Sequence, residues 1–131
     1  MAFKEQRTHH AALYSVLYYY YYYYYYYYYY YYYYYYYIID LPKFLTHPSN
    51  SSVELGGEVT LECNALGDPL PTFKWYKDSN PMVETDDINP FLPELVLKDA
   101  VTQDEAWYFC EATNVAGTVR SNSVSLKVFG E

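Results

Sequence analysis

The feature that most constrains this chain is the spacing of its two cysteines and one of its tryptophans. Cys63 is followed about one strand later by Trp75, and Cys110 lies far downstream, with Tyr108 two residues before it. This order is typical of a two-sheet β-sandwich in which a disulfide joins the sheets beside a buried indole. We therefore expect an all-β fold, a Greek-key sandwich, for the part of the chain that contains these residues.

The two cysteines are the minimum for one bridge. The alternative, a metal site, lacks further ligands, because His47 is the only histidine after the tyrosine run and no Cys-x-x-Cys is present. We therefore expect a disulfide between Cys63 and Cys110. A bridged pair indicates an oxidising compartment, hence secretion or an ectodomain. Some intracellular sandwich domains carry cysteines at the same places and keep them reduced.

A change in composition divides the chain into two parts. An unbroken tyrosine run at residues 18–37 supplies most of the 24% aromatic content, and all 5 glycines and 7 prolines lie after it. We place a low-complexity leader at residues 1–40 and one domain at residues 41–129, close to the size of a sandwich domain of about 100 residues. A domain this small buries a limited core, so a covalent link is a useful supplement.

The charge and the motifs exclude several classes of function. The net charge of −8 all comes from the residues after Leu41, and an acidic surface without a basic cluster repels phosphate backbones, so we expect no nucleic-acid partner. No nucleophile–base pair, phosphate loop or metal cluster is recognisable, so we expect neither an enzyme nor a cofactor. Glu84, Asp86 and Asp87 are interpreted as a solvated loop rather than a calcium site.

The leader gives few signs of a structural role. It has no apolar stretch followed by a small-residue cleavage site, so we do not interpret it as a secretory signal. The tyrosine run is long enough to span a bilayer, but phenol groups need partners and favour the membrane interface, so we expect no membrane insertion. Such a run can mark an aggregation-prone segment, but we favour a repeated single codon read at a mis-annotated exon boundary. We assign the segment no stable fold, although a helix or an extended strand is compatible with this interpretation.

The rest of the chain alternates in the manner of β-strands. Apolar residues share one parity over residues 59–65 and again at 95–97, so one side of each segment is predicted to face a core. By the same alternation, residues 73 and 75 are predicted to face the core, as are residues 108, 110 and 112. Prolines interrupt residues 81–93, which we therefore predict to form short edge strands.

These residues resemble the immunoglobulin superfamily, and specifically its intermediate type, the I-set, over about residues 41–129. The resemblance rests on P-K-F at 42–44, on G-D-P-L-P at 67–71 and on residues 95–110, which read L-x-L-x-x-A-x-x-x-D-x-A-x-Y-x-C. The interval between the cysteines leaves no room for the two extra strands of a variable-type domain. The resemblance implies an immunoglobulin-like sandwich without catalytic residues.

The resemblance also implies structural roles for the motif residues. Trp75 and Leu97 are expected to pack in the core beside the bridge. Tyr108 is expected to form a tyrosine corner, in which its hydroxyl bonds to backbone a few residues upstream, and Asp104 is expected to belong to the same turn.

Four surface residues are candidates for function. Asn50-Ser51-Ser52 is an N-glycosylation sequon, which on a secreted domain can carry a glycan or remain an unused match. Trp107 and Phe109 have the parity opposite to the core residues, and Tyr76 is predicted to point the same way on a neighbouring strand. Exposed aromatics on one sheet face suggest a binding surface. The alternative is that these rings pack against a neighbouring domain or lie at a partly covered turn.

Two functions are compatible with these features. The first is a protein-binding module of an extracellular or cell-surface protein of the adhesion, guidance or receptor type. It would be a fragment of a larger protein with neighbouring immunoglobulin-like or fibronectin-type domains, and it would bind homophilic or heterophilic protein partners through a sheet face. The alternative is a structural I-set domain of an intracellular muscle or cytoskeletal filament protein, cytoplasmic or sarcomeric. A bridge with a glycan at Asn50 favours the first, and free thiols favour the second.

Overall fold

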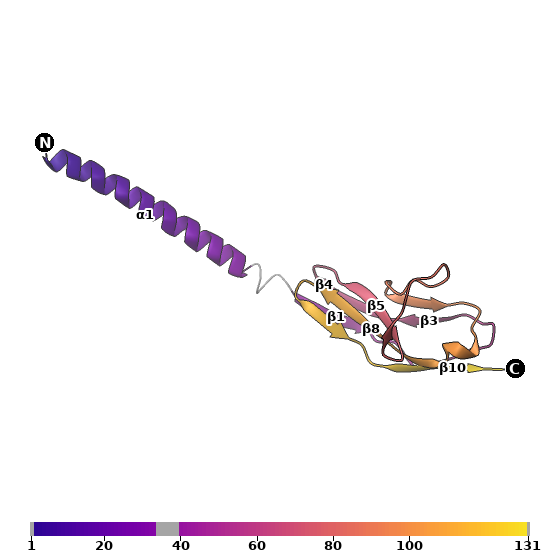
Figure 1. Ribbon diagram of the computed structural model, residues 1–131. Helices are drawn as coiled ribbons and strands as arrows, with labels where there is room; N and C mark the ends of the chain where they lie inside the picture. The colour runs from indigo at the N-terminus through magenta and orange to yellow at the C-terminus, as the bar shows by residue number, and fades with distance from the viewer. Residues whose placement is uncertain (1, 34–39, 131) are drawn as a thin grey trace. The chain divides into compact units, whose positions relative to one another are not determined.

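The computed structural model describes residues 2–33 and 40–130, and the chain divides into two compact units, Met1–Ile38 and Ile39–Glu131. In the first unit the described residues form one helix. In the second they form strands, with a short 3-10 turn at Thr102–Asp104. Figure 1 shows both units. The all-β prediction therefore holds for the second unit.

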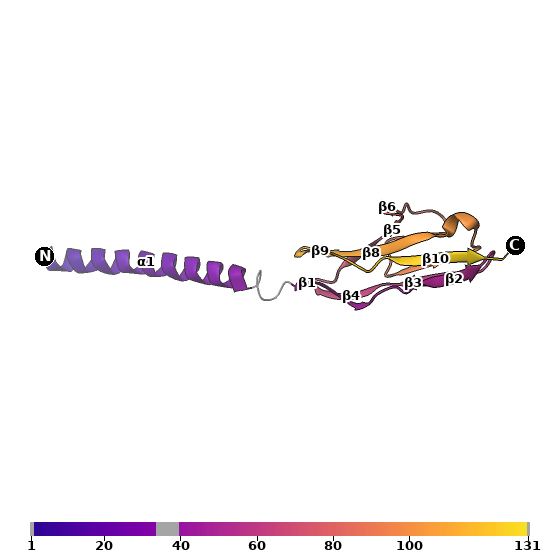
Figure 2. The same cartoon turned by 90° about the horizontal axis from the view of Figure 1, so that it is seen from below.

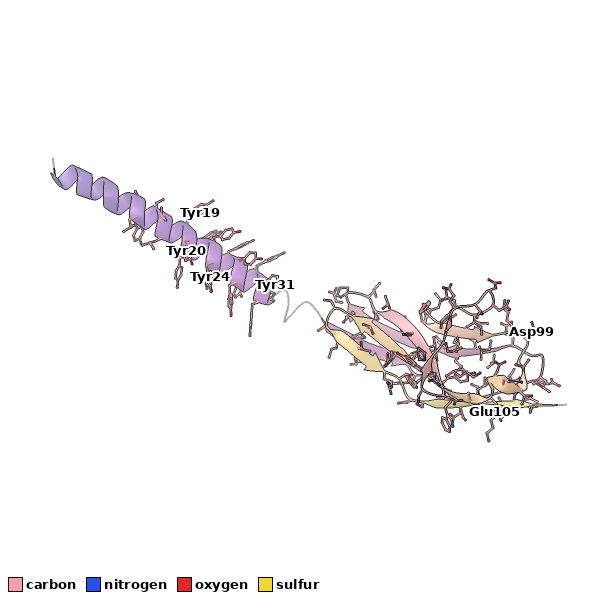
Figure 3. All side chains as sticks on the ribbon, in the orientation of Figure 1. Tyr19, Tyr20, Tyr24, Tyr31, Asp99 and Glu105 are labelled. Atoms are coloured by element: carbon pink, nitrogen blue, oxygen red, sulfur yellow. A yellow bond between two sulfur atoms is a disulfide. The ribbon has the colours of Figure 1, made fainter. Side chains whose placement is uncertain are left out.

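Residues 2–33, to which we assigned no stable fold from the sequence, form the helix α1 (Ala2–Tyr33). A helix satisfies its backbone groups internally, and side chains four residues apart meet on its surface. The rings of Tyr18 and Tyr22 accordingly stack at 6.2 Å between centroids, and those of Tyr25 and Tyr29 at 5.8 Å. The tyrosines project in several directions from α1 (Figure 3) and are roughly half to three-quarters exposed.

Each of these stacked pairs, from Tyr18–Tyr22 to Tyr29–Tyr33, joins rings one turn apart on α1. No helix among the described residues has both the length and the apolar character needed to cross a membrane.

One layer of the sandwich consists of two antiparallel pairs. β1 (Asp40–Thr46) pairs with β4 (Asn64–Asp68), and β3 (Val59–Glu62) pairs with β7 (Glu94–Leu97). Only Cys63 separates β3 from β4 along the chain, so the two pairs follow one another in a single layer.

The other layer is one sheet centred on β8. Its strand order is β2 (Ser51–Glu54), β10 (Val124–Phe129), β8 (Ala106–Asn114), β5 (Thr72–Lys77) and β6 (Asn80–Pro81), and β9 (Gly117–Arg120) also pairs with β8. The β2–β10 pair is parallel and the other pairs are antiparallel. In Figure 2, β8 and β9 lie in the upper layer, and β1, β4 and β3 in the lower layer.

The core lies between the layers and follows the predicted parity. Its most deeply buried large residues come from β3, β5, β7, β8 and β10, together with the cysteine after β3: Leu61, Cys63, Trp75, Leu95, Leu97, Tyr108, Cys110 and Leu126. Burying each large apolar side chain contributes about 1.5–3 kcal/mol relative to exposure. The alternation therefore accounts for both the strand positions and the driving force that joins the sheets.

The segment between β5 and β7 contains less strand than the sequence suggests. Of the edge strands predicted for residues 81–93, the structure contains only the two-residue β6, and no strand follows until Glu94. Proline lacks an amide hydrogen, so Pro90 and Pro93 cannot donate to a ladder. Pro90 is instead buried, and its carbonyl accepts from the Trp75 amide at 3.0 Å.

Candidate functional site

The centre of the sandwich holds the bridge and the tryptophan. Cys63 and Cys110 form a disulfide that joins the two layers, with their Cα atoms 6.6 Å apart. Trp75 lies opposite Cys110 in the β5–β8 ladder and has no exposed surface. Its indole Nε1–H donates to the Leu92 carbonyl at 2.9 Å. Because a buried indole N–H needs a partner, this bond fixes the ring and also anchors the irregular segment before β7.

Tyr108 and Asp104 meet at the 3-10 turn that precedes β8. The Tyr108 hydroxyl donates to the Asp104 carbonyl at 2.6 Å, and the Asp104 carboxylate accepts from the Val101 amide at 2.9 Å. Burial raises the pKa of the Tyr108 phenol, and the carboxylates of Asp104 and Asp78 raise it further. The phenol is therefore kept neutral, as a hydrogen-bond donor must be.

Asn50 lies on the exposed surface before β2. Its side-chain carbonyl accepts from the Ser125 amide at 3.0 Å, which ties the sequon to β10. A glycan attaches to the amide nitrogen of asparagine, so this hydrogen bond leaves the attachment atom unused.

The three aromatic residues predicted to form one exposed face have different environments. Tyr76 and Phe109 stack with 4.7 Å between ring centroids and 12° between ring planes. Arg120 covers the same phenyl ring, with its Cζ atom 4.2 Å from the centroid. Phe109 is therefore only 4% exposed, which corrects the prediction that its ring is open to solvent. The alternation correctly predicted that Phe109 points away from the core. It could not predict that Tyr76 and Arg120 cover the ring.

A polar network surrounds this stack. Glu111 accepts from the Tyr76 hydroxyl at 2.8 Å and from Arg120 Nη2 at 3.2 Å. The hydrogen bond to Glu111 raises the pKa of Tyr76, as do partial burial and the carboxylate charge, while Arg120 lowers it. An ion pair at the surface contributes little free energy, so the main effect of Glu111 is to fix the orientation of both partners. Glu111 and Arg120 were not predicted from the sequence, although Glu111 shares the parity of Phe109 and pairs with Arg120 across the β8–β9 hairpin.

Trp107 is the exposed member of the three. Trp107 is 56% exposed. Its backbone amide and its backbone carbonyl are both hydrogen-bonded to Asp78. The Trp107 amide donates to the Asp78 carboxylate at 3.0 Å, and the Asp78 amide donates to the Trp107 carbonyl at 2.8 Å. A groove of about 710 Å³ runs beside it, lined by Asp78, Glu105, Ala106, Trp107, Ser125, Leu126 and Lys127. An aromatic ring on a fixed backbone next to mixed charges is suited to contact with a protein.

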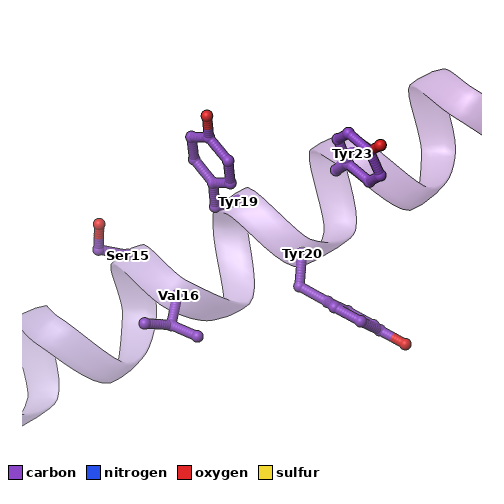
Figure 4. Close-up of a pocket in the computed structure, with 5 residues that line it drawn as sticks. All are labelled: Ser15, Val16, Tyr19, Tyr20 and Tyr23. Carbon is purple, nitrogen blue, oxygen red and sulfur yellow. The ribbon is translucent and has the colours of Figure 1, made fainter.

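A second hollow lies on α1 but has no opposing wall. It is lined by Ser15, Val16, Tyr19, Tyr20 and Tyr23, all on adjacent turns of one helix (Figure 4). A small-molecule site normally encloses most of its ligand, which a single helix cannot do. Within residues 2–33 and 40–130, no group of His, Cys, Asp or Glu could hold a metal ion.

Known proteins with similar segments include a muscle protein and a cell adhesion molecule. The chain is 36% identical over 88 residues to the muscle M-line assembly protein unc-89 of Caenorhabditis elegans, covering 63% of this chain and 1% of that protein. It is 39% identical over 87 residues to neural cell adhesion molecule 1 of Bos taurus, covering 63% of this chain and 10% of that protein. The chain thus spans a tenth or less of the curated relatives it matches. Modules of this kind occur in a muscle assembly protein and in an adhesion molecule.

A solved structure and a family model agree on the fold. The crystal structure of the titin M3 domain superposes with a TM-score of 0.61 at 29% identity, covering 68% of this chain and 97% of that chain. The family model described as immunoglobulin domain matches residues 42–114, more than half of the chain. The matched residues contain the bridge, Trp75 and Tyr108, whose geometry is described above. The chain therefore belongs to the immunoglobulin domain family.

Proposed function

We propose that this chain is a non-catalytic protein-binding module of an adhesion, guidance or receptor-type ectodomain, and a segment of a larger protein with several immunoglobulin-like domains. The similarity to neural cell adhesion molecule 1 supports this class, as does the small share of each relative that the chain spans. Neighbouring immunoglobulin-like or fibronectin-type domains complete the protein in this proposal, and its partners are proteins, homophilic or heterophilic.

The observation that carries the binding role is the exposure of Trp107 on the β8 sheet. Large exposed aromatics on a rigid backbone are the residues that most often dominate binding energy in protein interfaces. Trp107 has such a backbone, and the adjoining groove supplies carboxylates from Asp78 and Glu105 and an ammonium group from Lys127. We therefore assign the binding face to Trp107 and this groove. Tyr76 lies half-buried on β5, and Phe109 supports it by stacking against its ring.

Cell-surface binding tests this role. The chain is secreted behind a heterologous signal peptide, multimerised with a fluorescent carrier, and applied to a panel of cells that each express one receptor ectodomain. Trp107→Ala should weaken binding to the partner at least about tenfold, as expected for an interface hot spot. Leu45→Ala is the matched control, because Leu45 is 58% exposed on β1, in the other layer. Equal binding by the two variants would remove Trp107 from the proposed interface.

The extracellular location has its own test. The Cys63–Cys110 bridge and the exposed sequon at Asn50 both support it. The chain secreted from animal cells should lose apparent mass on treatment with an N-glycosidase, and Asn50→Gln should abolish that change. A secreted chain of unmodified mass would argue against a glycan at this position.

The runner-up function is a structural domain of an intracellular filament protein. The 36% identity to unc-89 and the superposition with titin M3 favour it. The two proposals differ in the redox state of the native protein. Alkylation of native tissue extracts without reductant should label neither Cys63 nor Cys110 if the protein is extracellular. Labelling of both cysteines would instead support the filament role.

A further inference from the structure

Within residues 40–130, the strand β7 has one edge without a partner strand. It pairs with β3 on one side, and its sheet contains no other strand. Among the described residues, no backbone or side-chain group outside this pair hydrogen-bonds to residues 94–98. The segment before β7 does not cover the edge with a strand, because its ordered bonds go to Trp75 and Cys63 instead. Such an edge is a template for pairing with another chain.

The hydrogen bond just before β7 establishes which residues of β7 direct their amide and carbonyl groups away from β3. The Cys63 amide donates to the Pro93 carbonyl at 2.8 Å, and these two residues continue the β3–β7 register. In an antiparallel pair, hydrogen-bonded positions alternate with positions whose amide and carbonyl point to the other side. Leu95 and Leu97 therefore bond toward β3, whereas Glu94 and Val96 direct their backbone groups to the open edge.

The side chains along this edge are complementary to themselves. Residues 94–98 read Glu-Leu-Val-Leu-Lys. If a second copy pairs antiparallel about Val96, then Val96 meets Val96, each leucine meets a leucine, and Glu94 meets Lys98 twice. Glu94 and Lys98 are exposed, Val96 is half-buried, and both leucines face the core, so the opposite charges meet on the outer surface. Opposite charges placed directly across a ladder stabilise the pairing.

Exposed apolar residues flank the edge at both ends. Phe91 and Leu92 precede β7 and are each 49% exposed, and Val101 follows it and is 47% exposed. An antiparallel partner brings the beginning of one β7 beside the end of the other. These apolar groups of the two copies would then adjoin and add buried area to the ladder.

We propose that β7 is a homophilic docking edge, at which a second copy of this chain adds its own β7 antiparallel about Val96 and joins the two sheets. The open outward backbone of Val96 and the Glu94–Lys98 complementarity carry this assignment. It does not depend on the β8 face, so it stands or falls separately from the proposed role of Trp107.

Cross-linking measures the register directly. In the full chain, Val96→Cys should form a disulfide-linked dimer under mild oxidation, because directly opposed residues in a ladder have Cβ atoms about 4.5–5.5 Å apart. Thr60→Cys is the matched control. Thr60 pairs with Val96 within one copy, so it lies on β3, behind β7. In the proposed dimer, both β7 strands therefore separate Thr60 of one copy from Thr60 of the other. Every variant carries the same α1, so association through α1 contributes equally to all. Equal cross-linking of the two variants, or no cross-linked dimer of the Val96→Cys variant, overturns the proposal.

Charge reversal tests complementarity without altering the core. Glu94→Lys and Lys98→Glu should each weaken self-association in analytical ultracentrifugation by about tenfold, because each change places like charges opposite one another at two sites. The double variant E94K/K98E restores opposite charges and should restore association to the wild-type level. A double variant that associates no better than the single variants overturns the pairing. Single variants that associate as the wild type does overturn it as well.

Discussion

The two faces of β8 differ in what surrounds alternate residues of one strand. On the inner face, Tyr108 and Cys110 are completely buried and contact groups far away in sequence, including Cys63. On the outer face, Phe109 is covered only by side chains of adjacent strands, and Trp107 is open. The inner residues are thus dictated by the fold. The outer residues are free of that constraint, and the exposure of Trp107 supports the proposed binding face.

Truncating the core tryptophan tests the inner face most severely. Trp75→Ala should lower the free energy of unfolding by roughly 3–5 kcal/mol, because it leaves a cavity at the centre of the sandwich and the Leu92 carbonyl loses its donor. Urea unfolding followed by far-ultraviolet circular dichroism measures the change. Trp75→Phe keeps most of the apolar volume and should cost less. Equal losses for the two variants would mean that cavity volume does not set the cost.

Removing the disulfide should lower the free energy of unfolding by a similar amount, because the unfolded chain gains conformational entropy. The cysteines are 47 residues apart in sequence, so the C63A/C110A double variant should lose roughly 4 kcal/mol of stability in the chain-entropy model. Urea unfolding of the wild type with and without reductant provides the comparison. Reduced wild type and double variant should unfold at similar urea concentrations. A wild type whose midpoint is insensitive to reductant would contradict the prediction.

The outer face gives a sharper contrast between neighbours two residues apart. Phe109→Ser should cost about 2 kcal/mol, the scale of burying a phenylalanine side chain, because Tyr76 and Arg120 lose the ring they pack against. Trp107→Ser should change stability by no more than about 0.5 kcal/mol, as is usual for an exposed position. Thermal unfolding of both variants decides between a structural and a purely surface role. Equal costs would remove the distinction between the two rings.

The sequence predicted the inner face well because its signals are local and periodic. Alternation fixes which residues of a strand face the core, and the order Cys63, Trp75, Cys110 is typical of one architecture. Few other residues could occupy these positions, because a close-packed core tolerates little change at a buried disulfide or a buried indole.

The outer face could not be predicted in the same way because it depends on neighbours in space. Parity turned Phe109 outward, but only the β8–β9 hairpin brings Arg120 over its ring. The open edge of β7 is a similar case, since it follows from the lack of strand in residues 82–93. The helix α1 could not be distinguished from an extended strand in the sequence, because a tyrosine homopolymer has no apolar periodicity, the signal by which helices are recognised.

The smallest expected effect concerns the hydroxyl of Tyr108. Tyr108→Phe should lower stability by about 1 kcal/mol at neutral pH, the net value of one hydrogen bond, because the Asp104 carbonyl loses its donor. The pKa of Tyr108 is raised above its ordinary value of 10.0 in the folded protein. The unfolded state therefore loses this proton first, so the stabilisation is complete below pH 10 and declines as the pH rises above it.

Urea unfolding at a series of alkaline pH values tests this dependence. The wild type should lose stability above pH 10 more steeply than Tyr108→Phe, which has no phenol to keep protonated in the core. Tyr76→Phe is the outer-face control. The pKa of Tyr76 is also raised, chiefly by its hydrogen bond to Glu111, but by less than the pKa of Tyr108. Removing the Tyr76 phenol should therefore leave most of the alkaline loss in place. If Tyr76→Phe abolished the loss and Tyr108→Phe preserved it, the outer face of β8 rather than the inner face would control alkaline stability.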